Sequence, residues 1–210
     1  MNTQIPQPST QKQPVIFLKG ERVFLRPLEM SDIDRCTLWV NDPEIRQFIT
    51  ITFPMSSQQE QSWLNDSVAS KDKVKLAIET HKGVHIGNIS IHEIDWINRT
   101  AETGTMIGDK EYWGKGYGTE AKMLLLDYMF NTLNLRKVHS SAYAFNERSI
   151  NYSLKCGYKI IGRLTEERFH DGKYHDVVLL EVFRDEWQSA HNAWRDSLKA
   201  SSVKSKTTSK

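Results

Sequence analysis

The chain has 210 residues, the size of one ordinary domain with tails. Charged residues make up 26% of it and hydrophobic residues 39%, a composition typical of globular proteins and not of disordered ones. No apolar stretch approaches the ~20 residues of a membrane-spanning helix, and residues 1–14 lack the basic start and apolar run of a signal peptide. With two cysteines and no disulfide framework, the sequence predicts a cytoplasmic protein without a membrane partner.

The net charge of +2 conceals an uneven distribution along the chain. Residues 199–210 hold four lysines and no acid, and Lys12 lies in the leading segment. Without these five lysines, residues 15–198 carry a net charge of about −3. A mildly acidic body argues against a nucleic-acid partner and is compatible with a cationic substrate.

Both ends of the chain have the composition of tails. Residues 1–14 are rich in Gln and Pro, residues 199–210 consist mainly of Lys, Ser and Thr, and neither segment has apolar periodicity. We therefore predict a disordered N-terminal tail at 1–14, a single domain at 15–198 and a disordered C-terminal tail at 199–210.

The first half of the predicted domain combines strands with two helices. Ser31 is expected to cap a first helix that stops before Pro43, and a second helix starts at Ser56 or Ser57 with a capping box. In the strand that follows residue 83, the apolar positions shift by one at Gly87-Asn88, which predicts a bulge. The expected strands of this half lie at residues 17–18, 23–25, 74–80, 84–95 and 101–107.

The second half opens on a glycine-rich loop and continues with alternating helices and strands. Asn146 and Gly157 frame a helix with a cap at each end, and Asp171-Gly172 is a hairpin signal. The order predicts a mixed α/β sandwich. The other expected elements are a helix at 119–133, strands at 137–142, 158–169 and 173–181, and a last amphipathic helix that carries Phe183, Trp187, Ala190 and Trp194.

The segment with the clearest chemistry is Gly114-Lys115-Gly116-Tyr117-Gly118, between a strand and a helix. Alternating glycines let the backbone approach a ligand closely, and the free N–H groups of the first helical turn point into the same loop. These features predict a pyrophosphate cradle. The loop matches neither the P-loop nor the strict dinucleotide fingerprint, and a tight turn that binds nothing is the alternative interpretation.

The sequence resembles the GNAT acetyltransferases, in particular the ribosomal-protein N-terminal acetyltransferase (RimJ/RimL) type. The loop matches the family motif except at its first position, where Trp113 stands in place of Gln or Arg. The resemblance covers about residues 15–185. Its other parts are Leu25-Arg26-Pro27-Leu28 with Asp32, Ala101-Glu102-Thr103-Gly104, Asn146-Glu147-Arg148-Ser149 and Gly157-Tyr158.

This resemblance implies an α/β GNAT fold, with a mostly antiparallel central sheet that is splayed between its fourth and fifth strands and flanked by helices. It implies an enzyme that transfers the acetyl group of acetyl-CoA to a primary amine by direct attack, without a metal. Asn146 would cap its helix and contact the cofactor. The other residues expected to bind acetyl-CoA are Met106 and Ile107, through backbone groups beside pantetheine, and Gly114, Lys115, Gly116, Tyr117, Gly118 and Thr119 around the pyrophosphate.

Two residues are expected to handle protons in the reaction. The resemblance implies that Glu102 accepts the proton of the amine through water, although a solvent-facing glutamate is an equal alternative. Many relatives have a tyrosine as the acid, at the position that is Ser153 here. Tyr152 is about 100° away around the helix, so we expect it not to substitute. Ser149 matches the serine of the RimJ/RimL type and is expected to hydrogen-bond the departing sulfur.

The acceptor amine cannot be identified from any motif. The candidate acceptors are a protein N-terminal amine, a polyamine, an aminoglycoside and an amino sugar. A homodimer is compatible with the sequence. Glu29, Asp32, Asp42 and Glu44 are candidates for attracting a cation, or are ordinary helix-end charges. No His/Cys/Asp set has the spacing of a zinc site. A CoA-binding regulatory or structural module with little turnover is the alternative function.

Overall fold

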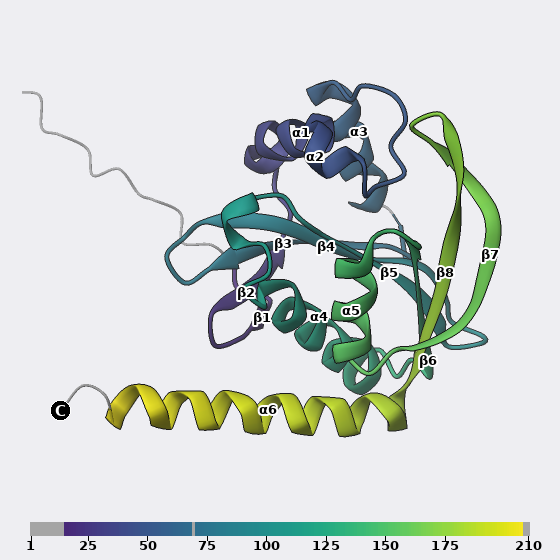
Figure 1. The fold of residues 1–210 in the computed structure, drawn as a ribbon. Coiled ribbons are helices and arrows are strands. Elements are labelled where there is room, and N and C mark those ends of the chain that lie inside the picture. The colour runs from purple at the N-terminus through teal and green to yellow at the C-terminus, as the bar shows by residue number, and fades with distance from the viewer. Residues whose placement is uncertain (1–14, 69, 208–210) are drawn as a thin grey trace, which may run out of the picture.

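The computed structural model describes residues 15–68 and 70–207, so the predicted tail at 1–14 lies outside the described residues. One sheet runs through the molecule in the order β1-β2-β3-β4-β5-β6-β8-β7, and every pair is antiparallel except β5 and β6 (Figure 1). The strands are β1 (Leu18–Lys19), β2 (Val23–Pro27), β3 (Val74–Thr80), β4 (His85–Asp95), β5 (Thr100–Ile107), β6 (Lys137–Tyr143), β7 (Lys159–His170) and β8 (Lys173–Phe183).

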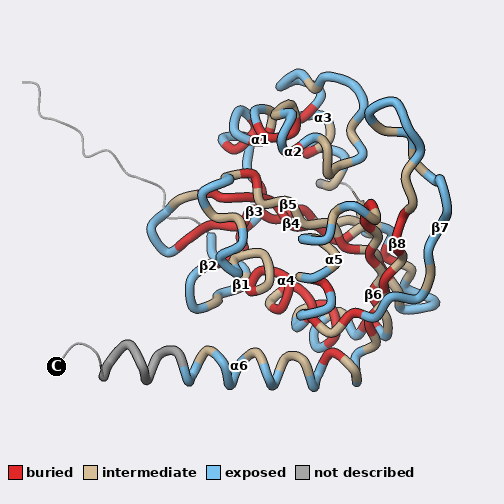
Figure 2. The backbone as a smooth tube through the Cα atoms, in the orientation of Figure 1, coloured by how far each residue is buried: buried red, intermediate tan, exposed pale blue. Residues whose placement is uncertain are grey.

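Helices cover both faces of this sheet. The small helices α1 to α3 lie on one face, while α4 and α5 lie on the other, with α6 running beyond them (Figure 1). The apolar core accordingly has two parts, a large one around α4 and a small one beneath α1 and α3 (Figure 2). The helices are α1 (Ile33–Asn41), α2 (Pro43–Arg46), α3 (Ser57–Val68), α4 (Tyr117–Asp127), α5 (Glu147–Lys155) and α6 (Arg184–Thr207), with short turns η1 (Met30–Asp32), η2 (Lys110–Tyr112) and the π-helical η3 (Tyr128–Thr132).

Local sequence signals explain several of these boundaries. The Asn146 side chain accepts a hydrogen bond from the Ser149 N–H at the start of α5, and Gly157 follows the helix with a φ of 92°. Asp171 and Gly172 both have positive φ, as a type I′ hairpin turn requires. These predictions are confirmed, because each rests on interactions between residues close in sequence.

Other boundaries differ from the prediction by a small shift. The extra residue of the β3–β4 bulge is Ile86, since Ile78 pairs with Gly87 and Glu79 pairs with His85. The cap predicted at Ser31 is wrong: Glu29 begins η1 and forms a capping box with Asp32. The Asp32 carboxylate accepts the Glu29 N–H, and the Arg26 guanidinium donates to both of its oxygens, so this carboxylate and not the Ser31 hydroxyl is fixed at the start of the helix.

Helix α6 continues past residue 198, where the predicted domain ends. Residues 199–207, expected to belong to a disordered tail, therefore continue a helix in the structure. No Gly or Pro occurs between Arg184 and Thr207, so nothing in the sequence ends the helix at 198. Trp187 anchors the first turns: it is fully buried and its ring lies 5.3 Å from that of Phe130.

The parallel pair β5–β6 opens after three residues. Backbone pairing joins Thr100, Ala101 and Glu102 to residues 137–139 and then stops, although both strands continue. If the two-residue strand β1 is left out of the count, β5 and β6 are the fourth and fifth strands of the expected fold. The predicted splay between them is confirmed. Beyond the pairing only side chains bridge the gap, with the Ser140 hydroxyl donating to the Thr103 carbonyl at 3.4 Å.

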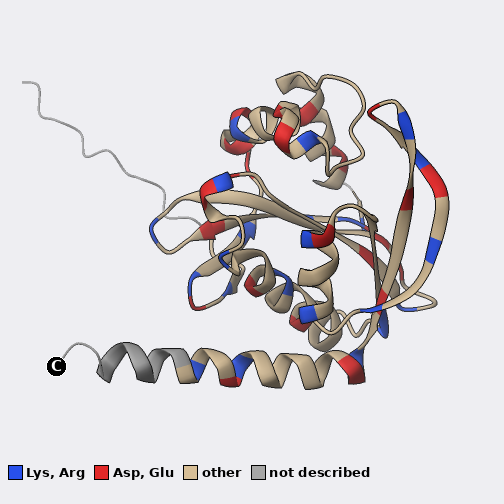
Figure 3. Cartoon of the chain, viewed as in Figure 1, with Lys and Arg blue, Asp and Glu red and all other residues tan. Residues whose placement is uncertain are grey.

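Two further features bear on possible partners. Lys and Arg alternate with Asp and Glu along the ribbon, without a uniformly basic face in this view (Figure 3). Within residues 15–68 and 70–207, no helix has the length and apolar character needed to cross a bilayer.

Candidate active site

A cleft of about 1100 Å³ occupies the gap where β5 and β6 part. Its walls come from elements far apart in sequence: α3, the inner strands β4 to β6, the glycine-rich loop and α5. The splayed strands leave unpaired backbone groups facing this space, which a ligand can satisfy. Most of the predicted site residues meet here: Glu102, Met106, Ile107, Gly114, Gly116, Tyr117, Gly118, Thr119, Asn146 and Ser149 all line the cleft, whereas Lys115 does not.

The glycine-rich loop has the conformation that its sequence predicts. Gly114 and Gly116 have φ values of 70° and 84°, a left-handed region that favours glycine, and Gly116 is the N-cap of α4. A Cβ on Gly114 would meet nothing within 4 Å, so the backbone is open to a ligand there. Free N–H groups at the start of α4 make this the place where an anionic group binds best.

Trp113 has a defined role beside this loop. Its indole Nε1 donates to the Ile107 carbonyl at 2.6 Å, so that carbonyl, expected to be available to pantetheine, already has one partner. The guanidinium of Arg148 lies over the Trp113 ring, 4.2 Å from its centroid. Trp113 therefore ties the end of β5 to α5 across the cleft.

Glu102 lies at the last position of β5 that pairs with β6, and it lines the cleft. Ser141 on β6 donates to its carboxylate at 3.2 Å. On β4, His92 is the register partner of Glu102, and its Nε2 lies 2.9 Å from the Ser90 hydroxyl oxygen. Burial is the largest influence on the pKa of His92 and lowers it from its usual value. The imidazole is therefore neutral at pH 7.

Helix α5 presents Ser149 and Tyr152 to the cleft. Ser153, at the position of the family tyrosine, is 1% exposed and does not line the cleft. Tyr152, which is expected not to substitute for the family tyrosine, nevertheless lines the cleft, because the cleft-facing stripe of α5 passes through residues three apart, 149, 152 and 155. Burial raises the pKa of Tyr152 above its usual value, so its phenol is protonated at neutral pH.

Behind this wall lies a fully buried lysine. Lys122 on α4 donates to the Thr103 hydroxyl at 2.5 Å, and its Nζ is within 6 Å of the ring centroids of Tyr152 and Tyr158. Burial lowers its pKa to about 8. Its charge supports any negative charge that develops in the cleft above Thr103.

The acidic residues of the cleft are not the four expected from the sequence. Asp32 is buried against Arg26, with His85 Nδ1 3.2 Å away, and Asp42 and Glu44 form exposed ion pairs with Lys110. None of these lines the cleft, and neither does Glu29. The carboxylates that do line it are those of Glu60, Asp66, Glu93 and Glu102.

Glu60 is the most deeply buried of them, at 3% exposure. No described residue donates a hydrogen bond to its side chain, and burial raises its pKa. Lys75 is the nearest cation, but its Nζ contacts the Trp63 carbonyl and lies 3.7 Å from the ring centroid of Trp63. A buried carboxylate without a donor is an acceptor for a cationic group of a ligand.

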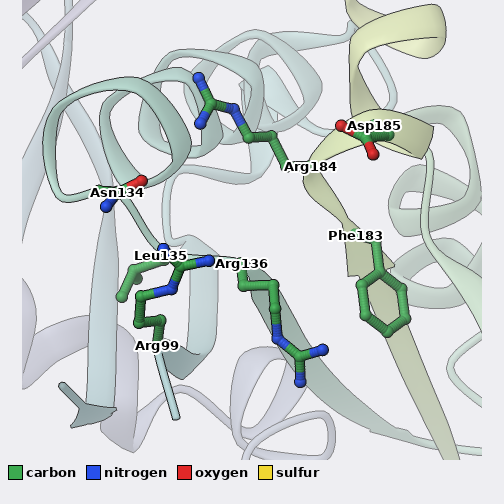
Figure 4. Close-up of a pocket in the computed structure, with 7 residues that line it drawn as sticks. All are labelled: Arg99, Asn134, Leu135, Arg136, Phe183, Arg184 and Asp185. Atoms are coloured by element: carbon green, nitrogen blue, oxygen red, sulfur yellow. The ribbon is translucent and has the colours of Figure 1, made fainter. Parts of the chain in front are cut away.

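A second, smaller hollow of about 190 Å³ lies between the segments that precede β5 and β6, the end of β8 and the start of α6. Arg99, Arg136 and Arg184 surround it, but their side chains point in different directions (Figure 4). Arg184 is also held by Asn131 at 3.0 Å, and Asp185 adds a negative charge. The hollow lacks converging donors, so the cleft is the candidate site.

The described residues offer neither a metal centre nor an activated thiol. They contain no group of three or more His, Cys, Asp or Glu side chains placed to hold a metal ion. Both cysteines are fully buried, and burial raises the pKa of Cys36 to about 11 and that of Cys156 to about 12. Neither thiol is a nucleophile at neutral pH.

Sequence reasoning missed His92 and Glu60 as cleft residues. Only His92 left a local signal, since it shares strand parity with the polar residues Asn88 and Ser90. For Glu60 the apolar spacing of α3 predicted a helix, but not that this side chain faces the cleft.

Three comparisons agree with this geometry. The sequence profile of the acetyltransferase (GNAT) domain family matches residues 22–159. The spermidine N(1)-acetyltransferase of Escherichia coli K12 is 29% identical over 169 residues, which cover 80% of this chain and 90% of that protein. YdaF of Bacillus subtilis, whose name describes a putative ribosomal N-acetyltransferase, is 34% identical over 108 residues, which cover 51% of this chain and 58% of that protein.

A solved structure has the same fold. The spermidine N-acetyltransferase of Vibrio cholerae, in complex with CoA and spermine, superimposes with a TM-score of 0.75 at 26% identity, covering 80% of this chain and 98% of that one.

Proposed function

The chain belongs to the GNAT acetyltransferases, which transfer the acetyl group of acetyl-CoA to an amine, and from this premise we propose that its acceptor is a polyamine. The main support is the carboxylate set of the cleft, with Glu60, Glu93 and Glu102 on the acceptor side. A polyamine carries several ammonium groups along a flexible apolar chain, which suits separate carboxylates around aromatic and aliphatic walls. The E. coli and V. cholerae relatives are named for spermidine.

Cationic side chains line both sides of the cleft. Arg148 lies over Trp113 beside the glycine-rich loop, where it suits a phosphate-bearing cosubstrate. On the side of α3 and β3, Lys73 and Lys75 lie among the carboxylates. Asp66 is paired with Lys73 at 2.9 Å, so the unpaired carboxylates of Glu60 and Glu102 contribute most.

The residues present fit acetyl-CoA, which supplies the acetyl thioester when bound. We propose that residues 114–119 hold the pyrophosphate through backbone N–H groups, that Met106 and Ile107 contact pantetheine, and that Asn146 borders the cofactor. The open backbone at Gly114 supports this assignment. Ile107 keeps a second carbonyl lone pair and its N–H for pantetheine, since Trp113 takes only one lone pair.

We propose that Glu102 faces the amine and favours the loss of its proton, and that the departing sulfur meets the α5 wall. Ser149 hydrogen-bonds this sulfur and Tyr152 supplies the proton, because both line the cleft and the phenol is the stronger acid of the two. The Glu102 carboxylate, half-buried and held by Ser141, faces the amine side.

A protein N-terminal amine, the RimJ/RimL-type acceptor, is the second candidate. The partial match to YdaF favours it. The cytoplasmic location expected from the sequence remains a prediction, as does the homodimer. For the latter, β7 is the outermost strand and exposes Ile160, Ile161 and Phe169, which supports association between copies.

The test is an acetylation panel read by mass spectrometry of the products. It includes spermidine, spermine, a peptide with a free N-terminus, an aminoglycoside and a nucleotide amino sugar. We expect spermidine and spermine to give the highest kcat/KM. Glu60→Gln should raise KM for spermidine about tenfold without changing acetyl-CoA affinity, and Asp42→Asn, outside the cleft, should change neither. Preference for the peptide would favour the second candidate, and binding of acetyl-CoA without turnover would favour a regulatory module.

A further inference from the structure

We propose that His92 is the base that takes the proton from the acceptor amine, and that Glu102 opposite it stabilises the resulting imidazolium. The proposal rests on the proposed function and names the proton acceptor of that same site. His92 and Glu102 are register partners on β4 and β5, and both line the cleft. Directly opposed residues of an antiparallel pair share a face, with Cβ atoms about 4.5–5.5 Å apart.

The backbone of β5 makes room for the imidazole ring. Gly104 is the partner of Ser90, and a Cβ added to Gly104 would lie 2.9 Å from His92 Nε2. Glycine at this position therefore allows the ring to lie across β5 toward the cleft. The ring is held there by the Ser90 hydroxyl oxygen, 2.9 Å from Nε2, so Nδ1 is the ring nitrogen to which no described residue is hydrogen-bonded.

Charges on all sides of His92 set its protonation. Burial acts most strongly and lowers the pKa, Lys122 on α4 and Lys75 on β3 lower it further, and Glu102 and Glu93 oppose them. The result is an imidazole that is neutral at pH 7 beside a carboxylate that favours its protonated form. That combination suits a general base, which must be unprotonated before the reaction and accept a proton during it.

The proton and electron balance is complete with the two substrates. The ammonium gives its proton to Nδ1 of neutral His92 and becomes a free amine. The amine lone pair forms the new C–N bond to the acetyl carbon, the C–S bond breaks, and sulfur takes the electron pair. The second amine proton passes to water as the amide forms. Tyr152 gives its proton to the CoA sulfur and is reprotonated from water, and the imidazolium returns its proton to water, so one proton is released per turnover.

The experiment compares His92→Gln with His139→Gln. His139 on β6 is the other strand neighbour of Glu102 and burial also lowers its pKa, but it does not line the cleft. We expect His92→Gln to lower kcat/KM for spermidine about 10²–10³-fold at pH 7, with partial recovery at high pH as the amine deprotonates in solution. His139→Gln should stay within about twofold of wild type, and acetyl-CoA affinity should be unchanged in both.

A second measurement does not depend on the folding of a variant. NMR titration of the wild-type imidazoles gives the pKa of His92, which should lie below the usual histidine value and coincide with the acidic limb of the kcat/KM profile. Glu102→Gln should lower both values together, because it removes the carboxylate that favours imidazolium.

The failures are distinguishable. Two results overturn this inference and leave Glu102 as the proton acceptor. In one, the acidic limb of the wild-type kcat/KM profile does not follow the titration of His92. In the other, His92→Gln keeps both its activity and the same acidic limb. A wild type that binds acetyl-CoA but acetylates no amine overturns the proposed function and this inference with it.

Discussion

Arg22 joins the start of the sheet to the glycine-rich loop through Glu120. The Arg22 backbone N–H and its Nε each donate to the Glu120 carboxylate at 2.8 Å, and its Nη1 donates to the Lys115 carbonyl at 2.9 Å. Glu120 lies in the first turn of α4 and is fully buried. The pair therefore fixes the loop from behind, on the side away from the cleft.

Replacing Glu120 should affect both stability and cofactor binding. Glu120→Ala leaves the N–H groups of Arg22 and Val23 without their acceptor, and each unsatisfied buried donor costs ~1–3 kcal/mol. We expect a lower urea midpoint and weaker acetyl-CoA binding by calorimetry. Glu120→Gln keeps one carbonyl acceptor and should lose about half as much. Equal behaviour of the two variants would contradict the role given to the carboxylate.

Gly116 offers a matched comparison of backbone strain and ligand binding. Gly116 has a φ of 84° and Gly172, in the distant β7–β8 turn, has a φ of 80°. Alanine at either position is strained by ~1–2 kcal/mol. We expect both variants to show a similar fall in melting temperature, but only Gly116→Ala to weaken acetyl-CoA binding, by tenfold or more. Similar acetyl-CoA affinities in both variants would show that the glycine-rich loop is not part of the acetyl-CoA site.

The same two glycines indicate what a sequence can predict. Gly116 and Gly172 act through their own backbone angles, and Asn146 through an N–H three residues away, so each was predictable. Chain-reversal and capping signals are local, and they set the order of elements. The local signals of the loop predicted a pyrophosphate cradle, whereas the splay and the identity of the cosubstrate as acetyl-CoA came from the resemblance to a family.

The acidic lining shows what the sequence could not provide. Asp32 directly precedes α1 and Glu60 lies in the first turn of α3, yet Asp32 is buried against Arg26 whereas Glu60 lies in the cleft without a donor among the described residues. Likewise, His92 and Glu102 meet only through the β4–β5 register. Such pairings depend on packing between distant elements, which spacing along the chain does not determine.

The two hydroxyls of α5 should differ in their effect on turnover. Ser149→Ala removes only a weak hydrogen bond to the departing sulfur, so kcat should fall less than about tenfold. Tyr152→Phe removes a protonated phenol from the cleft wall and should lower kcat about 10²-fold. Leu154→Ala, on the exposed side of α5, is the control and should change kcat little. A larger loss of kcat for Ser149→Ala than for Tyr152→Phe would show that Ser149, and not Tyr152, protonates the departing sulfur.

Acid should destabilise the protein through Asp32. Burial alone would raise the pKa of Asp32, but hydrogen bonds from Arg26 and His85 outweigh it and hold this pKa below its usual range. A lowered folded-state pKa stabilises the protein above the unfolded value of about 4, and this contribution is lost as pH falls below it. We expect the free energy of unfolding to fall more steeply from pH 5 to pH 3 in wild type than in Asp32→Asn.

A matched variant separates this effect from general acid unfolding. Lys110 also lowers the pKa of Asp42, but water screens this pair near the surface, so Asp42→Asn should change the pH dependence much less than Asp32→Asn. Asp32→Asn should also lower stability by ~3 kcal/mol at pH 7, because Arg26 stays buried with Glu79 as its remaining carboxylate. An unchanged pH slope in Asp32→Asn would show that other carboxylates govern acid unfolding.

The central claim is that acetyl-CoA and the amine occupy one cleft together and react directly. Both cysteines are buried, with the pKa of Cys36 raised to about 11 and that of Cys156 to about 12, so neither offers a thiolate for a covalent acetyl-enzyme. The most direct test is the initial-velocity pattern with acetyl-CoA and spermidine varied together. We predict intersecting double-reciprocal lines, as a ternary complex requires; parallel lines would show that the acetyl group passes through the enzyme and would contradict direct transfer.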